Sequence, residues 1–132
     1  MEELESEATI QTEIFNMIDD SIDSENFVKE LFSYNKKLFI EKAIYLKSKK
    51  ILKKNLSNEY YETIKPLLKM KGIPDFLIFN KLTKELMFVE VKTENTGLSS
   101  YQIEWITNAY QKGIIIKLIY IKRLLKGEIK NE

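Results

Sequence analysis

Two neighbouring apolar segments of this 132-residue chain are bordered by charged residues that a buried strand would not ordinarily carry. Residues 76–79 (Phe-Leu-Ile-Phe) and 86–89 (Leu-Met-Phe-Val) have the composition of core strands. Asp75 comes directly before the first segment, and Glu90 and Lys92 follow the second. Strand interiors are depleted in charged residues, and burying an unpaired charge is costly. A bound divalent cation would account for these charges, so the pattern predicts a pair of strands that ends at a metal site.

A hairpin between the two segments would bring the acids together. If residues 81–84 form a four-residue loop, Phe79 pairs with Leu86 and, counting outward, Asp75 pairs with Glu90. Lys92 then lies two residues further along the same face. Like charges at paired positions repel each other, whereas a cation between them reverses the sign of the interaction. A slip of one residue would send one acid to the other face, and the alternative reading is a surface strand with scattered charges.

The composition limits which chemistry the chain can carry. It has no Cys and no His, which excludes disulfides, thiolate or imidazole zinc sites, cysteine nucleophiles and histidine-dependent triads. Oxygen ligands remain, and these favour Mg²⁺ or Mn²⁺. The length and the 44% hydrophobic content suit one compact domain. No apolar run is long enough to span a membrane and the acidic N-terminus is unlike a signal peptide, so we expect a soluble, cytoplasmic protein.

The net charge of +1 conceals an uneven distribution. Residues 1–28 carry nine acidic and no basic side chains, so the rest of the chain holds all 21 basic groups against 11 acidic ones. Such a basic body suits a polyanion such as nucleic acid, although lysines that merely solvate the surface are an equal alternative. Because only Arg123 is an arginine, sequence-specific reading of bases is not expected. The expected nucleic-acid contacts are Lys47, Lys49, Lys50, Lys53, Lys54 and Lys71.

Hydrophobic periodicity predicts an α/β or α+β chain in which helices pack on a sheet. Helices are expected at residues 9–22, from an N-cap at Ser24 to Phe32, at about 38–52, and at 99–111 with Gly113 as the C′ residue. Strands are expected at residues 60–67, 75–79, 86–93 and 114–121. The chain thus divides into an acidic N-terminal helical segment (1–24), a main domain (25–126) and a frayed tail (127–132).

Three motifs in the main domain resemble those of the PD-(D/E)XK nuclease superfamily. Gly-Ile-Pro-Asp at residues 72–75 resembles its G-x-P-D element, and Glu-Val-Lys at 90–92 matches E-x-K after an apolar strand. Residues 98–105, Leu-Ser-Ser-Tyr-Gln-Ile-Glu-Trp, resemble the L-S-x-x-Q-x-x-W segment of the VRR-NUC branch. The likeness covers about residues 41–121 and extends more loosely to archaeal-type Holliday junction resolvases. It implies a restriction-endonuclease-like core, with a mixed central sheet flanked by helices. The acidic N-terminal segment and the long stretch before Gly72 depart from the family pattern.

The resemblance also implies a metal-dependent phosphodiesterase site. Asp75, Glu90 and the backbone carbonyl of Val91 would hold Mg²⁺ or Mn²⁺. Lys92 would orient the nucleophilic water or stabilise the pentacovalent phosphate. Gln102 has two compatible roles, because the family's matching glutamine faces the catalytic site and because Ser-x-x-Gln from Ser99 is a capping box. Trp105 is expected in the core rather than on a base-stacking surface.

One further acid of the site comes from an early helix in this superfamily. Glu41 is expected to supply it, since residues 41–46 resemble the start of that helix and precede Asp75 by a suitable distance. Glu25 and Glu30 are the alternatives, and each can also be read as an ordinary surface acid.

The expected function is a Mg²⁺-dependent DNA endonuclease that hydrolyses phosphodiester bonds. Lysine contacts favour backbone and shape, so branched, flapped or nicked DNA is expected rather than a defined sequence. A homodimer, as in the dimeric resolvases, would present two active sites to two strands. Two alternatives stay open: a non-catalytic nucleic-acid-binding module on the same scaffold, and a restriction or toxin component whose acidic N-terminus masks the basic groove. DNA or RNA, cleavage polarity and biological pathway are not specified by the sequence.

Overall fold

A five-stranded mixed sheet forms the centre of the molecule, in the strand order β1-β5-β4-β3-β2. The structure, a computed structural model, describes residues 10–17, 23–93 and 96–123. Strands β2, β3 and β4 pair antiparallel, whereas β5 runs parallel to both of its neighbours, β4 and β1. The strands are β1 (Ile10–Met17), β2 (Leu38–Lys42), β3 (Phe76–Asn80), β4 (Leu86–Thr93) and β5 (Ile115–Arg123).

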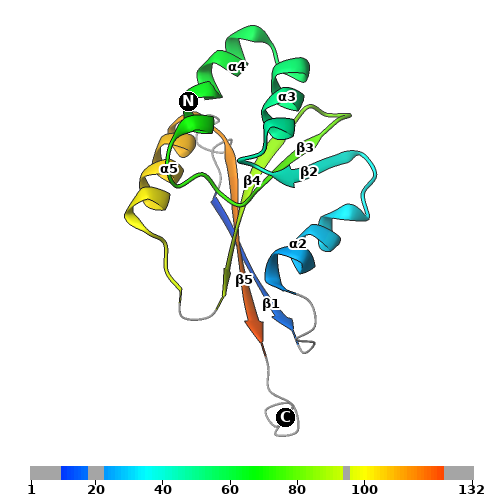
Figure 1. The fold of residues 1–132 in the computed structure, drawn as a ribbon, viewed down its shortest axis with the longest axis vertical. Helices are drawn as coiled ribbons and strands as arrows, with labels where there is room; N and C mark the ends of the chain where they lie inside the picture. The colour runs from blue at the N-terminus through cyan, green and yellow to red at the C-terminus, as the bar shows by residue number, and fades with distance from the viewer. Residues whose placement is uncertain (1–9, 18–22, 94–95, 124–132) are drawn as a thin grey trace, which may run out of the picture.

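Helices cover both faces of this sheet, as Figure 1 shows with α5 and α2 on opposite sides. They are α2 (Ser24–Ser33), α3 (Leu46–Asn55), α4 (Asn58–Ile64), the 3₁₀ helix η1 (Lys65–Lys69) and α5 (Ser100–Gln111). A mixed sheet flanked by helices confirms the predicted fold class. Within the described ranges, no helix is both long enough and apolar enough to cross a membrane.

Each face of the sheet buries its own apolar cluster. The larger cluster contains Leu77, Phe88 and Trp105 and extends to η1 and α5, and the smaller one lies beneath α2 around Val28. Trp105 is fully buried, its indole N–H donates to the Leu67 carbonyl at 2.7 Å, and its ring meets that of Phe88 edge-on at 4.9 Å. The core position predicted for Trp105 is confirmed.

The β3–β4 hairpin has the predicted register. Phe79 pairs with Leu86 and Phe76 with Val89, around a loop of residues 81–84. The Asn80 N–H donates to the Glu85 carbonyl at 2.8 Å, and the Asn80 side chain accepts N–H groups from inside the loop. Lys84 adopts the left-handed conformation that closes the loop. A local turn that satisfies its own backbone thus sets the pairing up to Phe76 and Val89, which are the direct neighbours of Asp75 and Glu90 in sequence.

The predicted helices beginning near Ser24 and spanning 99–111, and the strands near 75–79, 86–93 and 114–121, are confirmed. Asp23 rather than Ser24 is the N-cap of α2, because its carboxylate accepts the Asn26 N–H at 2.8 Å. Gly113 follows the C-cap of α5 with φ +76°, as predicted for C′. The tail at 127–132 lies outside the described residues.

Three predicted elements are wrong. Residues 10–17 form strand β1 rather than helix, because β5 offers an edge with which they pair in parallel over eight positions; residues 9 and 18–22 lie outside the described residues. Residues 60–67 belong to α4 and η1 rather than to a strand, since the Ser57 hydroxyl caps a helix there by accepting the Tyr60 N–H. The helix predicted from about residue 38 starts only at Leu46, because Leu38–Lys42 pairs with β3 as strand β2.

Candidate active site

Asp75 and Glu90 come together where β3 begins beside β4. The Asp75 carboxylate accepts the backbone N–H of Val91 at 2.8 Å, which fixes it next to the strand that carries Glu90. Glu90 is only 5% exposed, and it is one of the few polar side chains buried in the described residues. The structure therefore brings together the two acids that the hairpin register predicted to be neighbours.

Lys92 and Gln102 complete a hydrogen-bonded group around Glu90. The Gln102 amide nitrogen donates to Glu90 Oε2 at 2.8 Å, and Lys92 Nζ lies 3.3 Å from the same oxygen. Lys92 Nζ also donates to Gln102 Oε1 at 2.9 Å. Gln102 Oε1 accepts the Ser99 N–H as well, and the Ser99 hydroxyl accepts the Gln102 N–H, so the predicted capping box is present. Gln102 thus caps α5 and contacts Glu90 at the same time.

Gly72 explains why the loop before Asp75 can lie so close to α5. It has φ +89°, and a Cβ atom at this position would lie 2.3 Å from the Tyr101 carbonyl oxygen and 2.9 Å from the Gln102 nitrogen. Only a glycine allows this close contact between the two backbones. The first residue of the G-x-P-D motif therefore determines how near the Asp75 loop lies to the helix that carries Gln102.

The electrostatics of the acid pair favour a bound cation. Burial, with a smaller contribution from the Asp75 carboxylate, raises the pKa of Glu90 to about 7 although Lys92 opposes the shift. Burial also raises the pKa of Asp75, against the lowering effect of the Val91 N–H. Because both carboxylates are buried and lie close together, a divalent cation bound to them would stabilise the charged form of each. Oxygen donors of this kind fit Mg²⁺ or Mn²⁺.

The structure distinguishes between the three candidates for the additional acid. Glu25 lies in the first turn of α2, and its carboxylate forms an ion pair with Lys42 Nζ at 2.5 Å. Burial has the largest effect on the pKa of Asp75, and the negative charge of Glu25 raises that pKa further. Glu41 lies on strand β2, not on a helix as predicted, and its carboxylate oxygens lie 3.8 Å from the ammonium groups of Lys29 and Lys47. Glu30 is exposed on α2.

Glu25 is thus the helix acid whose charge acts on Asp75. The sequence could have indicated the position of Glu25, because the helix that begins at Ser24 was predicted and Glu25 falls in the first turn of that helix. However, no group of three or more Asp and Glu side chains in the described part of the chain is close enough to form a ready metal cage.

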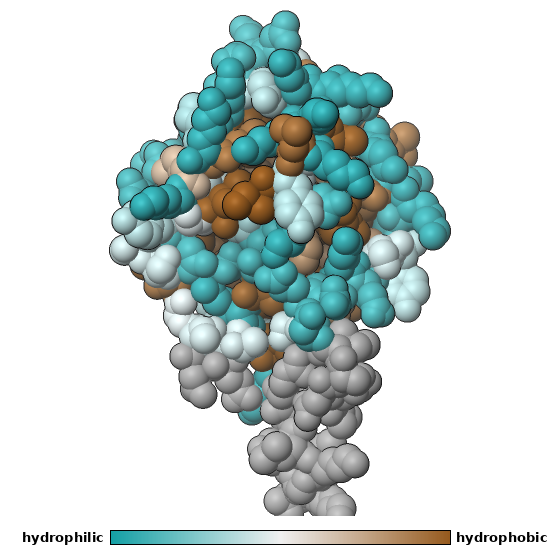
Figure 2. All heavy atoms as spheres, in the orientation of Figure 1, coloured by the Kyte–Doolittle hydropathy of each residue, from teal (hydrophilic) through white to brown (hydrophobic). Residues whose placement is uncertain are grey.

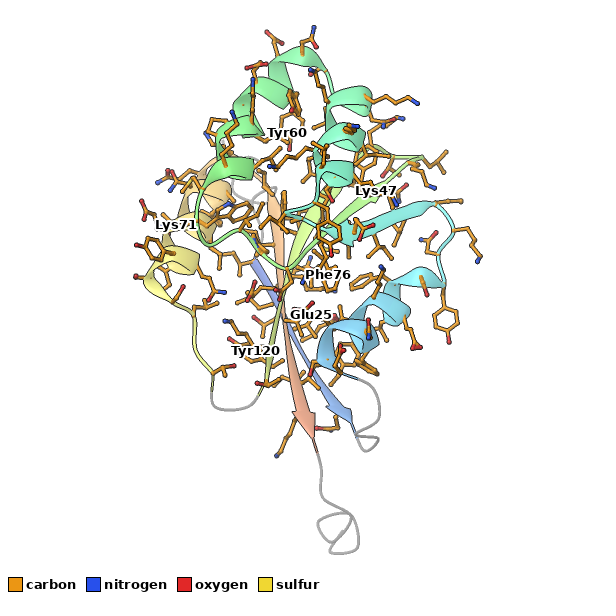
Figure 3. All side chains as sticks on the ribbon, in the orientation of Figure 1. Glu25, Lys47, Tyr60, Lys71, Phe76 and Tyr120 are labelled. Carbon is orange, nitrogen blue, oxygen red and sulfur yellow. The ribbon has the colours of Figure 1, made fainter. Side chains whose placement is uncertain are left out.

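The predicted nucleic-acid contacts fall into two places. Lys47, Lys49, Lys50, Lys53 and Lys54 all lie on α3, which has no acidic residue. Lys71 lies after η1, with its Nζ 5.1 Å from the centre of the Tyr101 ring. Figure 3 shows Lys47 and Lys71 on either side of the region that contains Glu25 and Phe76. The predicted basic contacts thus come from two separate parts of the chain.

Comparison with known proteins identifies the family of this chain. The family model of the VRR-NUC domain matches residues 25–122. No match was found among curated proteins. Among solved structures, the chain is similar to paFAN1 bound to 2nt 5′ flap DNA with gap, at 20% sequence identity and a TM-score of 0.40. That alignment covers 52% of this chain and 16% of paFAN1, so the chain spans a small part of that protein's length. Because the VRR-NUC model covers most of the 132 residues, including every motif described above, the chain belongs to the VRR-NUC domain family.

Proposed function

We propose that this protein is a metal-dependent DNA endonuclease that selects its substrate by DNA structure rather than by sequence. The observation that carries the proposal is the buried Asp75–Glu90 pair with Lys92 and Gln102 bonded to Glu90. Family membership supports it, because the residues of this group match the family motifs. Nuclease activity, the metal and the DNA substrate are parts of the proposal.

Mg²⁺ or Mn²⁺ is the proposed cofactor. Asp75, Glu90 and the Val91 carbonyl would hold the ion, and Glu25 rather than Glu41 would be the helix acid that lies near this site without binding the ion. When bound, the ion would activate water and neutralise charge on the scissile phosphate. The raised pKa values of Asp75 and Glu90 support this assignment, because a cation would favour the charged form of each.

The chain's own residues hold the reacting groups in place. The Val91 N–H orients Asp75, and Gln102 orients both Glu90 and Lys92. Lys92 uses two of its three N–H donors on Gln102 and Glu90, which leaves one to donate to a water or to a phosphate oxygen. Donors fixed before the reaction stabilise developing negative charge without a cost of reorganisation.

The lysines of α3 support a polyanionic substrate read through its backbone. Five lysines on one short helix without an acidic residue give a strong local positive field. Such contacts neutralise phosphates and carry no sequence information of their own. We therefore propose branched, flapped or nicked DNA as the substrate. A homodimer stays a prediction that light scattering would test.

Cleavage of matched linear, flapped and four-way DNAs in Mg²⁺, with the cut sites mapped, tests this function. Asp75→Asn and Glu90→Gln should each lower the cleavage rate by roughly 10²- to 10³-fold, and circular dichroism should show an intact fold. Glu85→Gln, which removes an exposed acid from the same hairpin, is the matched control and should cleave normally. Undiminished cutting by both site variants would refute the mechanism. DNA binding without cleavage by the unaltered chain, in Mg²⁺ and in Mn²⁺, would instead identify a binding module.

A further inference from the structure

The turn between β2 and α3 displays three large apolar side chains in succession. Ile44, Tyr45 and Leu46 are 62%, 52% and 63% exposed. Single exposed apolar residues are common, but a contiguous group rimmed by polar residues marks a contact surface. Figure 2 shows a brown, apolar group near the start of α3 among teal, hydrophilic side chains.

A backbone hydrogen bond joins this turn to Asp75 of the candidate active site. Ala43 is fully buried, and its N–H donates to the Asp75 carbonyl at 3.0 Å. The Tyr45 N–H and the hydroxyl of the buried Ser48 both donate to the Lys42 carbonyl, at 3.0 and 2.8 Å. The turn therefore presents its apolar side chains at a fixed position relative to Asp75.

A cavity of about 320 Å³ opens between this turn and α2. It is lined on one side by Glu25, Asn26 and Lys29, and on the other by Glu41, Lys42 and Tyr45, and Phe76 of β3 completes the lining. Figure 3 shows Glu25 and Phe76 near the middle of the molecule, below Lys47. Phe76 directly follows Asp75, and Lys42 directly precedes Ala43, whose N–H donates to the Asp75 carbonyl, so the cavity adjoins Asp75. Its volume is near the lower end of the range for small-ligand sites, about 300–1,000 Å³.

The charges around the cavity suit an uncharged ligand with a polar edge. Lys42 is paired with Glu25, and Lys29 with Glu41, so two lysines are balanced by two glutamates. A phosphate would gain little there. A nucleobase has a flat apolar face for Tyr45 and polar edge atoms for Asn26, and the phosphates joined to it could follow the lysines of α3.

We propose that this cavity receives one unpaired base of the DNA next to the scissile phosphate, with the Tyr45 ring stacked on it. Ile44 and Leu46 then pack against the neighbouring base where the paired region ends. This inference rests on the proposed function and deepens it, because a pocket for a single unpaired base would make the enzyme select flapped or branched DNA over a continuous duplex.

Binding of a fluorescent base tests the proposal without any cleavage. The probe is a DNA duplex with one unpaired 2-aminopurine at a flap, and the reference is the same duplex with that 2-aminopurine paired. Both are titrated with the full chain in EDTA. The unaltered protein should quench the unpaired probe, because stacking quenches 2-aminopurine, and it should bind this DNA more tightly than the reference.

Tyr45→Ala should weaken binding of the flapped DNA by roughly 5- to 100-fold and abolish the quenching. It should leave the affinity for the paired reference unchanged. Tyr45→Phe keeps an aromatic ring and should behave like the unaltered protein, and Tyr110→Ala removes an exposed tyrosine from α5 as the matched control. Ile44→Ser should lower the affinity for the flapped DNA while the quenching persists.

Equal weakening on both DNAs, or no change with Tyr45→Ala, would overturn the base pocket. These readouts need no catalysis, so cleavage that depends on Asp75 and Glu90 combined with unchanged quenching would overturn the pocket and leave the proposed function standing. If the unaltered chain bound neither DNA, the base pocket and the proposed function would both be refuted.

Discussion

Glu90 is a buried acid whose protonation depends on what lies beside it. Its pKa of about 7 in the folded chain is well above its ordinary value of 4.5. A raised carboxyl pKa means that the folded state binds the proton more tightly than the unfolded state does. Without metal, the stabilisation from protonated Glu90 is complete below about pH 4.5 and is lost as the pH rises to about 7. Asp75 is shifted in the same direction.

The difference in unfolding free energy between the unaltered chain and Glu90→Gln should therefore depend on pH in EDTA. Relative to Glu90→Gln, the unaltered chain should lose about 3 kcal/mol of stability between pH 4.5 and 7. Urea unfolding at closely spaced pH values measures this difference. Adding Mg²⁺ should stabilise the unaltered chain more at pH 8 than at pH 5.5, since the ion competes with the proton. A pH-independent difference would show that Glu90 is not buried beside Asp75 in solution.

Gln102 belongs to the capping box of α5 and also contacts Glu90 and Lys92, and two substitutions can separate these roles. Ser99→Ala removes the hydroxyl that caps α5 and should cost about 1 kcal/mol of stability while sparing the bonds from Gln102 to Glu90 and Lys92. Gln102→Ala removes those bonds as well, and should lower the cleavage rate by about 10- to 100-fold beyond the effect of Ser99→Ala. Urea unfolding and single-turnover cleavage at saturating DNA measure the two effects. Equal rates for the two variants would limit Gln102 to capping.

At the scale of elements, the sequence predicted best where local chemistry decides the structure. The hairpin register and the capping box were predictable because Asn80, Ser99 and Gln102 satisfy backbone groups a few residues away. Residues 10–17 and 38–42 were assigned to helices because their apolar residues also fit a helical spacing. They are strands because distant segments, β5 and β3, offer them an edge. A contact of that kind leaves no local signal. Glu41 was assigned to a helix because residues 41–46 also resemble the start of the superfamily's early helix, whereas it lies on β2.

Gly72 connects two elements, and replacing it should separate them. Gly72→Ala adds a Cβ atom 2.3 Å from the Tyr101 carbonyl oxygen, so α5 or the Asp75 loop must move. We expect a loss of roughly 3 kcal/mol or more, because the strain of φ +89° adds to the steric clash. Gly113→Ala is the matched control, since φ is +76° there but nothing lies within 4 Å of an added Cβ. It should cost only about 1 kcal/mol. Urea unfolding compares the two, and similar losses would contradict the close contact at Gly72.

At the scale of the whole molecule, the residues that the family model matches do not include the whole of the central sheet. The VRR-NUC match begins at residue 25, whereas the sheet includes β1 at Ile10–Met17. Strand β1 pairs with β5 at eight positions, Glu13 binds Lys117 at 2.7 Å, and Phe15 meets Phe27 of α2 edge-on. The predicted acidic N-terminal segment at 1–24 therefore contains a strand of the fold at Ile10–Met17.

Two truncations separate these structural and electrostatic roles. Deleting residues 1–24 removes β1 and leaves one edge of β5 unpaired, so the chain should lose cooperative thermal unfolding and aggregate on size-exclusion chromatography. Deleting residues 1–9 keeps β1 and removes Glu2, Glu3, Glu5 and Glu7, which raises the net charge from +1 to +5. This shorter deletion should unfold at the same temperature as the full chain. If the acidic segment masks the lysines of α3, it should also bind DNA more tightly, with the gain shrinking as salt is added. If the chain without residues 1–24 were a cooperatively folded monomer, β5 would not need to pair with β1 for the sheet to be stable.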